Sequence, residues 1–191
     1  LCDAIAGLEV LGSAFDAGEK RIPRQTRALR EGDEVPFGGR SFSILEIPGH
    51  TLGAIAFASD RDLFTGDTLF LGGCGRVFEG TMPMMRASLE RLARLDGHLR
   101  VWCGHEYTER NLEFALAVEP ESASVRTRLD RARATRASGE PTVPGRLGDE
   151  HDTNPFFRSA AAAVRAFAAT RGDASSADEV FARVREAKNS F

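Results

Sequence analysis

Three short segments of the sequence place a possible metal ligand directly after a glycine. They are His50 in IPGHT, Asp67 in FTGDT and His105 in WCGH. A strand that ends in glycine can turn sharply and bring the next side chain close to the ends of other strands. Two imidazoles and one carboxylate suit Zn²⁺ or a similar divalent ion, and three protein ligands leave room for water. Such a site produces hydroxide near neutral pH.

Each segment alone has an ordinary explanation. A histidine at a strand end is commonly a hydrogen-bonded structural residue, and Gly-Asp commonly forms a turn. The shared context of all three segments favours a metal site, because it takes up two of the four histidines in the chain. The other two, His98 and His151, have polar neighbours, and we predict that both lie on the surface.

The elements that must position these ligands follow from hydrophobic spacing and from helix start and stop signals. We predict strands over 8–11, 40–47, 54–58, 62–65 and 99–102, and helices over 83–95, 111–118, 122–137, 158–170 and 176–188. Pro83 suits a first helical turn, Pro120 ends a helix, and Ser176 with Glu179 has the spacing of a capping box. Segments 16–33 and 139–150 are predicted loops. The prediction is a mixed α/β domain over 1–120 and a helical domain over 121–191.

Composition narrows the functional class. The chain has 191 residues, 42% hydrophobic and 28% charged, which is typical of a globular protein. Its net charge of −3 does not favour a polyanionic partner. Five arginines occur on one predicted helix, at 126, 128, 131, 133 and 136, but they spread around it. We interpret them as a solvated face and predict no nucleic-acid binding.

Cysteine usage and hydropathy indicate the compartment. Cys2, Cys74 and Cys103 are an odd and sparse set, which favours a reducing environment without disulfides. No apolar run approaches the ~20 residues that span a bilayer. The sequence therefore predicts no membrane association and a cytoplasmic location.

Longer stretches around the three ligands resemble glyoxalase II, the hydroxyacylglutathione hydrolases of the metallo-β-lactamase superfamily. The resemblance spans Gly38 to Phe191 and is carried by GHTLG at 49–53, FTGDTLFLGGCGRVFEGT at 64–81, CGHEYTERNLEFA at 103–115, VEP at 118–120, EPTVP at 140–144, NPFFR at 154–158 and VREAKNSF at 184–191. The strand-end ligands indicate only the superfamily. The GCGR-x-FEG loop, the HEYT context and the basic helical tail are specific to this family.

The resemblance implies an α+β fold of the αββα type, a sandwich of two sheets flanked by helices, followed by a helical domain that holds glutathione. It also implies hydrolysis of S-D-lactoylglutathione and related 2-hydroxyacyl thioesters to glutathione and D-lactate, the second step of methylglyoxal detoxification. The nucleophile would be a metal-activated hydroxide.

The resemblance also assigns the site residues. His50 and His105 resemble ligands of one metal each, and Asp67 resembles the carboxylate that bridges two divalent ions, most often Zn²⁺, with Fe or Mn as alternatives. The implied glutathione contacts are Arg76, Phe78, Tyr107, Arg185 and Lys188. Three of these residues have an alternative interpretation or depart from the family. Phe78 stands where the family often has tyrosine. Arg185 and Lys188 lie near the end of a predicted helix, where cations commonly only complement the helix dipole.

One family motif is missing from the sequence. Members carry Thr-His-x-His-x-Asp-His upstream, whereas no histidine precedes His50 and the chain opens with Leu1. We therefore expect an N-terminally incomplete sandwich, further metal ligands upstream of Leu1, and little or no activity from these 191 residues alone.

Two other functions stay open, and the protein is expected to be a monomer. A glutathione persulfide dioxygenase using iron shares the GHT and GDT patterns, although the long helical tail argues against it. A non-catalytic module that binds glutathione or a partner is favoured by the missing motif.

Overall fold

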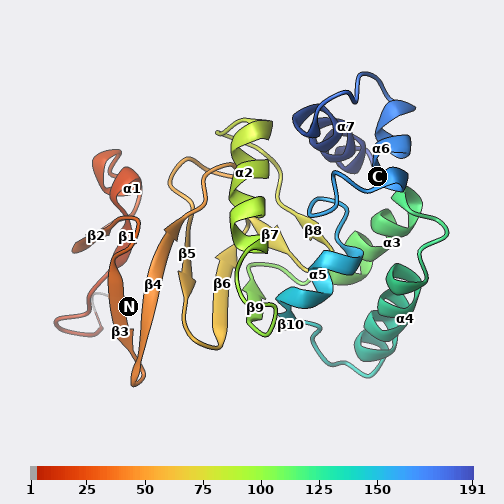
Figure 1. Ribbon diagram of the computed structural model, residues 1–191. Coiled ribbons are helices and arrows are strands. Elements are labelled where there is room, and N and C mark those ends of the chain that lie inside the picture. The colour runs from red at the N-terminus through yellow and green to blue at the C-terminus, as the bar shows by residue number, and fades with distance from the viewer. Residues whose placement is uncertain (1–3) are drawn as a thin grey trace.

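The computed structural model describes residues 4–191, with a sheet at one end and most helices gathered at the other (Figure 1). The strands are β1 (Leu11–Ser13), β2 (Arg27–Leu29), β3 (Glu34–Phe37), β4 (Arg40–Glu46), β5 (Ile55–Ala58), β6 (Asp62–Gly66), β7 (Leu69–Phe70), β8 (Gly73–Cys74), β9 (Arg100–Cys103) and β10 (Gly145–Arg146). The helices are α1 (Ala14–Gly18), α2 (Met82–Ala93), α3 (Thr108–Val118), α4 (Ala123–Ala137), α5 (Leu147–Thr153), α6 (Ala162–Ala169) and α7 (Ala177–Asn189).

The direction of the strands decides where their ends meet. The main sheet has the order β10-β9-β6-β5-β4-β3, and β1 with β2 and β7 with β8 form two small pairs. Strand β5 is antiparallel to both β4 and β6, whereas β6 is parallel to β9. Strands β4, β6 and β9 therefore run in the same direction. Their carboxyl ends lie at one edge of the sheet, and each is followed by one of the predicted ligands.

One face of the sheet is covered by helix α2, which crosses it in Figure 1. Met85, Leu89 and Leu92 recur at helical spacing, and all three are fully buried against Leu63 and Val101 of the sheet. Each such side chain contributes roughly 1.5–3 kcal/mol by leaving water. The helix begins after Thr81, whose side chain accepts a hydrogen bond from the Met84 amide, with Pro83 in its first turn. The predicted helix over 83–95 is confirmed.

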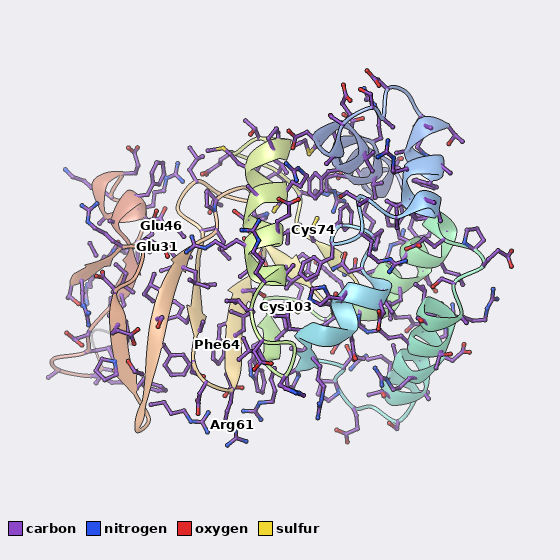
Figure 2. All side chains as sticks on the ribbon, in the orientation of Figure 1. Glu31, Glu46, Arg61, Phe64, Cys74 and Cys103 are labelled. Atoms are coloured by element: carbon purple, nitrogen blue, oxygen red, sulfur yellow. The ribbon has the colours of Figure 1, made fainter. Side chains whose placement is uncertain are left out.

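The opposite face carries a buried carboxylate and exposed aromatic rings. Asp62 accepts hydrogen bonds from Arg100 at 2.7 and 2.8 Å, from Trp102 at 2.8 Å and from Arg40 at 2.8 Å. The Arg100 hydrogen bonds, with those of Trp102 and the nearby charges, lower the pKa of Asp62 to about 2. Phe64, labelled in Figure 2, stacks on Trp102 and is 41% exposed.

The helical half has its own aromatic packing. Phe156 lies against both Phe114 and Phe181, and all three rings are fully buried. Helix α7 begins with the predicted capping box, in which the side chains of Ser176 and Glu179 each bond the other residue's amide. The predicted start of this helix is confirmed.

Several local predictions are wrong. Strand β2 lies within the predicted loop 16–33, and α1 overlaps its start. Strand β10 lies within the predicted loop 139–150, and α5 begins in this loop and continues to Thr153. The strand expected over 8–11 starts only at Leu11, and the helix expected over 158–170 is limited to Ala162–Ala169. These elements are short, and tertiary contacts rather than local propensity determine them.

The prediction that all five arginines of α4 are solvated is also partly wrong. Four of the five arginines on α4 are exposed, but Arg128 is only 6% exposed and pairs with the fully buried Glu150. His98 and His151 are exposed, as predicted. Cys74 and Cys103 are free, and Cys2 lies outside the described residues. Within residues 4–191, no helix has both the length and the apolar character needed to cross a membrane.

Candidate active site

The three predicted ligands meet at the carboxyl-end edge of the sheet, in the loops that follow β4, β6 and β9. We call His50, Asp67 and His105 the ligand rim. The loops are tied together, because the Gly104 amide donates to the Gly66 carbonyl at 2.9 Å. Gly66 has φ +50°, and a Cβ on Gly104 would lie 2.3 Å from Asp67 Oδ1. Glycine before the ligand is therefore a steric requirement at these two positions.

The geometry of the ligand rim centres on a single carboxylate oxygen. Asp67 Oδ2 lies 3.6 Å from His50 Nε2 and 3.4 Å from His105 Nε2. Two ligands of one tetrahedral zinc ion at 2.0–2.2 Å are separated by roughly 3.4 Å. Each imidazole is thus spaced from Asp67 as a second ligand of a shared ion would be. The donor set fits a carboxylate that bridges two ions with one imidazole on each side.

These three side chains do not complete a site. Within residues 4–191 there is no group of three or more His, Cys, Asp and Glu side chains that could hold a metal ion by itself. A dinuclear centre on the ligand rim requires additional donors for each ion.

The orientation of His50 is fixed by backbone. Its Nδ1 lies 2.9 Å from the carbonyl oxygen of Arg76. A carbonyl can only accept, so Nδ1 is the donor, and in the neutral imidazole the lone pair then lies on Nε2, which faces Asp67. This is the arrangement by which a second contact prepares a histidine for metal binding.

A cavity of about 530 Å³ opens beside the ligand rim. All eight predicted site residues line it, so the structure brings together the three ligands and Arg76, Phe78, Tyr107, Arg185 and Lys188. Sequence reasoning missed other lining residues, among them Phe70, Arg110, Asn111 and Phe191. Arg110 could have been found, because it lies three residues after Tyr107 and so shares its face of α3.

Aromatic rings flank both histidines. His105 stacks on Tyr107 with ring centroids 4.8 Å apart, and Phe70 meets both rings edge-on. On the other side, the Phe78 ring lies 5.0 Å from that of His50 and is 67% exposed. An exposed apolar ring beside the ligand rim offers a contact surface for a substrate.

Three basic side chains from two helices also line the cavity. We call Arg110 of α3 with Arg185 and Lys188 of α7 the basic wall. Lys188 Nζ donates to the Arg110 carbonyl at 3.1 Å and lies about 5 Å from the Phe114 and Phe191 rings. Burial, reinforced by the charges of Arg185 and Arg110, lowers the pKa of Lys188 to about 8. An anionic ligand there would favour the charged amine.

Arg185 is more deeply placed than a residue that only contacts a ligand. It is 3% exposed, and its Nη1 donates to the Cys74 carbonyl at 2.7 Å. Its Nε is buried without a partner among the described residues. Arg185 therefore supports the loop at Cys74 and keeps one donor unused.

The fold and site belong to a known class. The family model of the metallo-β-lactamase superfamily matches residues 6–105, and that of the hydroxyacylglutathione hydrolase C-terminus matches residues 106–191. A metallo-β-lactamase from Staphylococcus aureus subsp. aureus COL superposes with a TM-score of 0.59, 20% identity, and coverage of 97% of this chain and 51% of its own. TTHA1623 in a di-iron-bound form has a TM-score of 0.52 at 26% identity, covering 81% and 67%. The predicted fold class is confirmed.

Curated relatives identify the family within the metallo-β-lactamase superfamily. The hydroxyacylglutathione hydrolase of Synechococcus sp. (strain JA-3-3Ab) is 47% identical over 184 residues, which are 95% of this chain and 71% of the relative. The chain belongs to the hydroxyacylglutathione hydrolase family. Its superfamily implies a dinuclear metal site, and in this chain Asp67 Oδ2 lies 3.6 Å and 3.4 Å from the two imidazole Nε2 atoms. The two family models meet between residues 105 and 106, and our division of the chain at 120/121 stays a prediction.

Proposed function

We propose that this protein hydrolyses 2-hydroxyacyl thioesters of glutathione, such as S-D-lactoylglutathione, to glutathione and D-lactate. The observation that carries the proposal is the single cavity that joins the ligand rim to the basic wall. The names of the curated relatives support the same reaction.

The cavity suits the charge of the substrate. A glutathione thioester carries two carboxylates and one ammonium group, so its ends are ionic while the thioester itself is neutral. Lys188 lines the cavity and is placed to receive a carboxylate, and Arg76, Arg110 and Arg185 add positive charge along it. Tyr107 and Phe78 would then flank the thioester beside the two histidines.

In this proposal, the three residues of the ligand rim would bind the metal ions. His50, Asp67 and His105 would hold two divalent ions together with further donors, and Zn²⁺, Fe and Mn all accept this donor set. The chemistry that such ions supply is Lewis acidity toward a carbonyl and a lowered pKa of water. Asp67 fixes the shared position, and the Arg76 carbonyl keeps His50 in the ligating tautomer. A thiolate leaving group needs little protonation, so no general acid is required of this chain.

The rest of the proposal concerns partners and place. We propose a small-molecule substrate, a monomeric protein and a cytoplasmic location, without a membrane or nucleic-acid partner. Burial raises the pKa of the Cys74 thiol, so this cysteine at the cavity is unsuited as a nucleophile.

The test separates binding from hydrolysis. We expect S-methylglutathione, which has no thioester to hydrolyse, to bind the 191-residue chain. We expect loss of thioester absorbance from S-D-lactoylglutathione in a longer chain that supplies the further metal donors, and there it should depend on added Zn²⁺. Absence of S-methylglutathione binding would overturn the glutathione assignment. Oxygen consumption with glutathione persulfide would favour the dioxygenase. A chain that holds two metal ions and binds S-methylglutathione, but does not hydrolyse S-D-lactoylglutathione, would favour a non-catalytic module.

A further inference from the structure

The segment Leu71–Arg76 forms part of the cavity wall, and helices hold it from behind. Cys74, Gly75 and Arg76 all line the cavity. Behind them, β7 and β8 are joined by a turn at Leu71 and Gly72. Figure 2 shows Cys74 where β8 meets the helical half of the molecule.

Three helix-borne side chains, together with Asn154 directly after α5, bond consecutive backbone groups of this segment. Asn111 of α3 donates to the Leu71 carbonyl at 3.1 Å, and Arg185 of α7 donates to the Cys74 carbonyl at 2.7 Å. Between them, Glu150 of α5 accepts from the Gly72 amide at 2.8 Å, and Asn154 donates to the Gly73 carbonyl at 3.0 Å. The backbone of the turn is therefore held by these four side chains in addition to the pairing of β7 with β8.

Glu150 is the centre of this arrangement. Its side chain is completely buried, and its Oε2 receives both the Gly72 amide and Asn154 Nδ2, the latter at 2.9 Å. Its Oε1 receives Arg128 Nη2. Arg128 is fixed in turn by the Asp149 carbonyl at 3.2 Å and by Thr153. A buried carboxylate is tolerated only when it is paired and hydrogen-bonded, so displacement of Glu150 would leave charges and an amide unsatisfied.

The turn leads directly to the ligand rim. After Cys74, the Gly75 amide donates to the Thr68 carbonyl at 3.2 Å, next to Asp67. The following residue, Arg76, supplies the carbonyl that accepts from His50 Nδ1 at 2.9 Å. A movement of the turn therefore changes the partner that sets the tautomer of His50.

We propose that Glu150 is a positioning residue for the ligand rim: with Arg128 and Asn154 it fixes the turn at Gly72 and Gly73, and the turn fixes the carbonyl that orients His50. The inference rests on the proposed function only in taking His50 as a ligand. Its basis is a continuous series of hydrogen bonds from α4 and α5 to the rim.

The test uses the metal-free 191-residue chain and does not depend on hydrolysis. In Glu150→Gln the side chain keeps its shape but loses its charge. Its amide group must then face three donors, which are the Gly72 amide, Asn154 Nδ2 and Arg128 Nη2. We expect the Gly72 and Gly75 amides to exchange with deuterium about tenfold faster relative to the global unfolding rate. We also expect nitrogen NMR at alkaline pH to show His50 changing from the Nδ1–H tautomer to a mixture.

A second ion pair, with a buried carboxylate and a half-buried arginine, provides the control. Arg158 donates to both carboxylate oxygens of Glu119 at 3.0 Å, and Glu119 is 5% exposed, but neither residue bonds the 71–76 segment. Glu119→Gln should lower stability without changing the two amides or the His50 tautomer. If Glu150→Gln does not fold, Arg128→Met with Glu150→Met replaces the ion pair by apolar side chains, which is commonly neutral or stabilising.

The double variant tests the positioning role of Glu150 separately from any loss of stability. We expect it to fold and still to show faster exchange at Gly72 and Gly75 and a mixed His50 tautomer, because the Gly72 amide has lost its acceptor. A folded double variant with wild-type exchange and tautomer would overturn the proposal, and so would equal effects of Glu150→Gln and Glu119→Gln. Either result would leave the glutathione-binding assay of the proposed function untouched.

Discussion

The ligand rim and the basic wall lie in one cavity but are built in different ways. Each rim residue follows a strand, and all three strands run in the same direction, so local sequence and sheet topology place the ligands. The wall joins Arg110 of α3 to Lys188 of α7, which are 78 positions apart and meet only through helix packing. Changes in the rim should therefore remove metal and chemistry, whereas changes in the wall should alter affinity for the substrate.

The largest effect is expected at the carboxylate that both imidazoles share. Asp67→Asn keeps the size of the side chain but removes the negative charge 3.4 and 3.6 Å from the two Nε2 atoms. In a chain that includes the additional donors, we expect loss of bound zinc and a fall in thioester hydrolysis of about 10³-fold or more. Metal per chain by plasma emission and the hydrolysis rate measure it, and exposed Asp60→Asn is the control. Two retained ions would show that Asp67 does not bridge them.

A smaller loss of zinc affinity is expected when a methyl group is added next to Asp67. Gly104→Ala places a methyl group 2.3 Å from Asp67 Oδ1, so the carboxylate or the loop must move. We expect zinc affinity to fall by about 10- to 100-fold, as for other displaced ligands. Competition with a chelator measures the affinity. Gly18→Ala, where nothing lies within 4 Å of the new methyl group, should leave it unchanged.

The wall should respond in binding alone. Lys188→Met keeps the length of the side chain and its contact with the Phe114 ring but removes the charge. We expect the Kd for S-methylglutathione to rise about tenfold, with zinc affinity unchanged. Titration calorimetry gives the Kd, and exposed Arg165→Met is the control for lost positive charge. Equal losses of zinc and ligand binding would remove the distinction between rim and wall.

The smallest effect is a dependence of binding on pH. The pKa of Lys188 is lowered to about 8, so its charge is present below that pH and lost as the pH rises through it. A carboxylate ligand prefers the charged amine, so affinity for S-methylglutathione should weaken above pH 8, by up to tenfold per unit. Calorimetry from pH 7 to 9.5 tests this. Lys188→Met should flatten the profile, and an unchanged slope in that variant would assign it to another group.

Much of the site could be predicted from the sequence because its signals are local. Glycine before His50, Asp67 and His105 marks three strand ends, and the structure brings them to one edge. Helix α2 and the start of α7 were predicted from spacing and capping residues. Arg185 and Lys188 were found only through the family resemblance, since cations at a helix end have no distinctive local signal.

The missed features depend on tertiary structure. Arg128 has the sequence neighbours of a solvated arginine, and only its contact with Glu150, 22 positions away, makes it a buried residue. Helix α5, which carries Glu150, lies in a segment whose glycines and prolines indicate a loop. The hydrogen bonds to the turn at Gly72 join α5 to a strand pair 78 positions earlier, which no local pattern reveals.

The stacking of His105 on Tyr107 sets a fixed length within the molecule. One residue separates them, and Tyr107 immediately precedes the first residue of α3, the helix that also carries Arg110. The rim and one side of the wall are thus joined by a short covalent segment, so breathing of the helical half moves both together. The separation between His105 and Arg110 is therefore limited by the chain segment 105–110 and does not depend on the packing of distant helices.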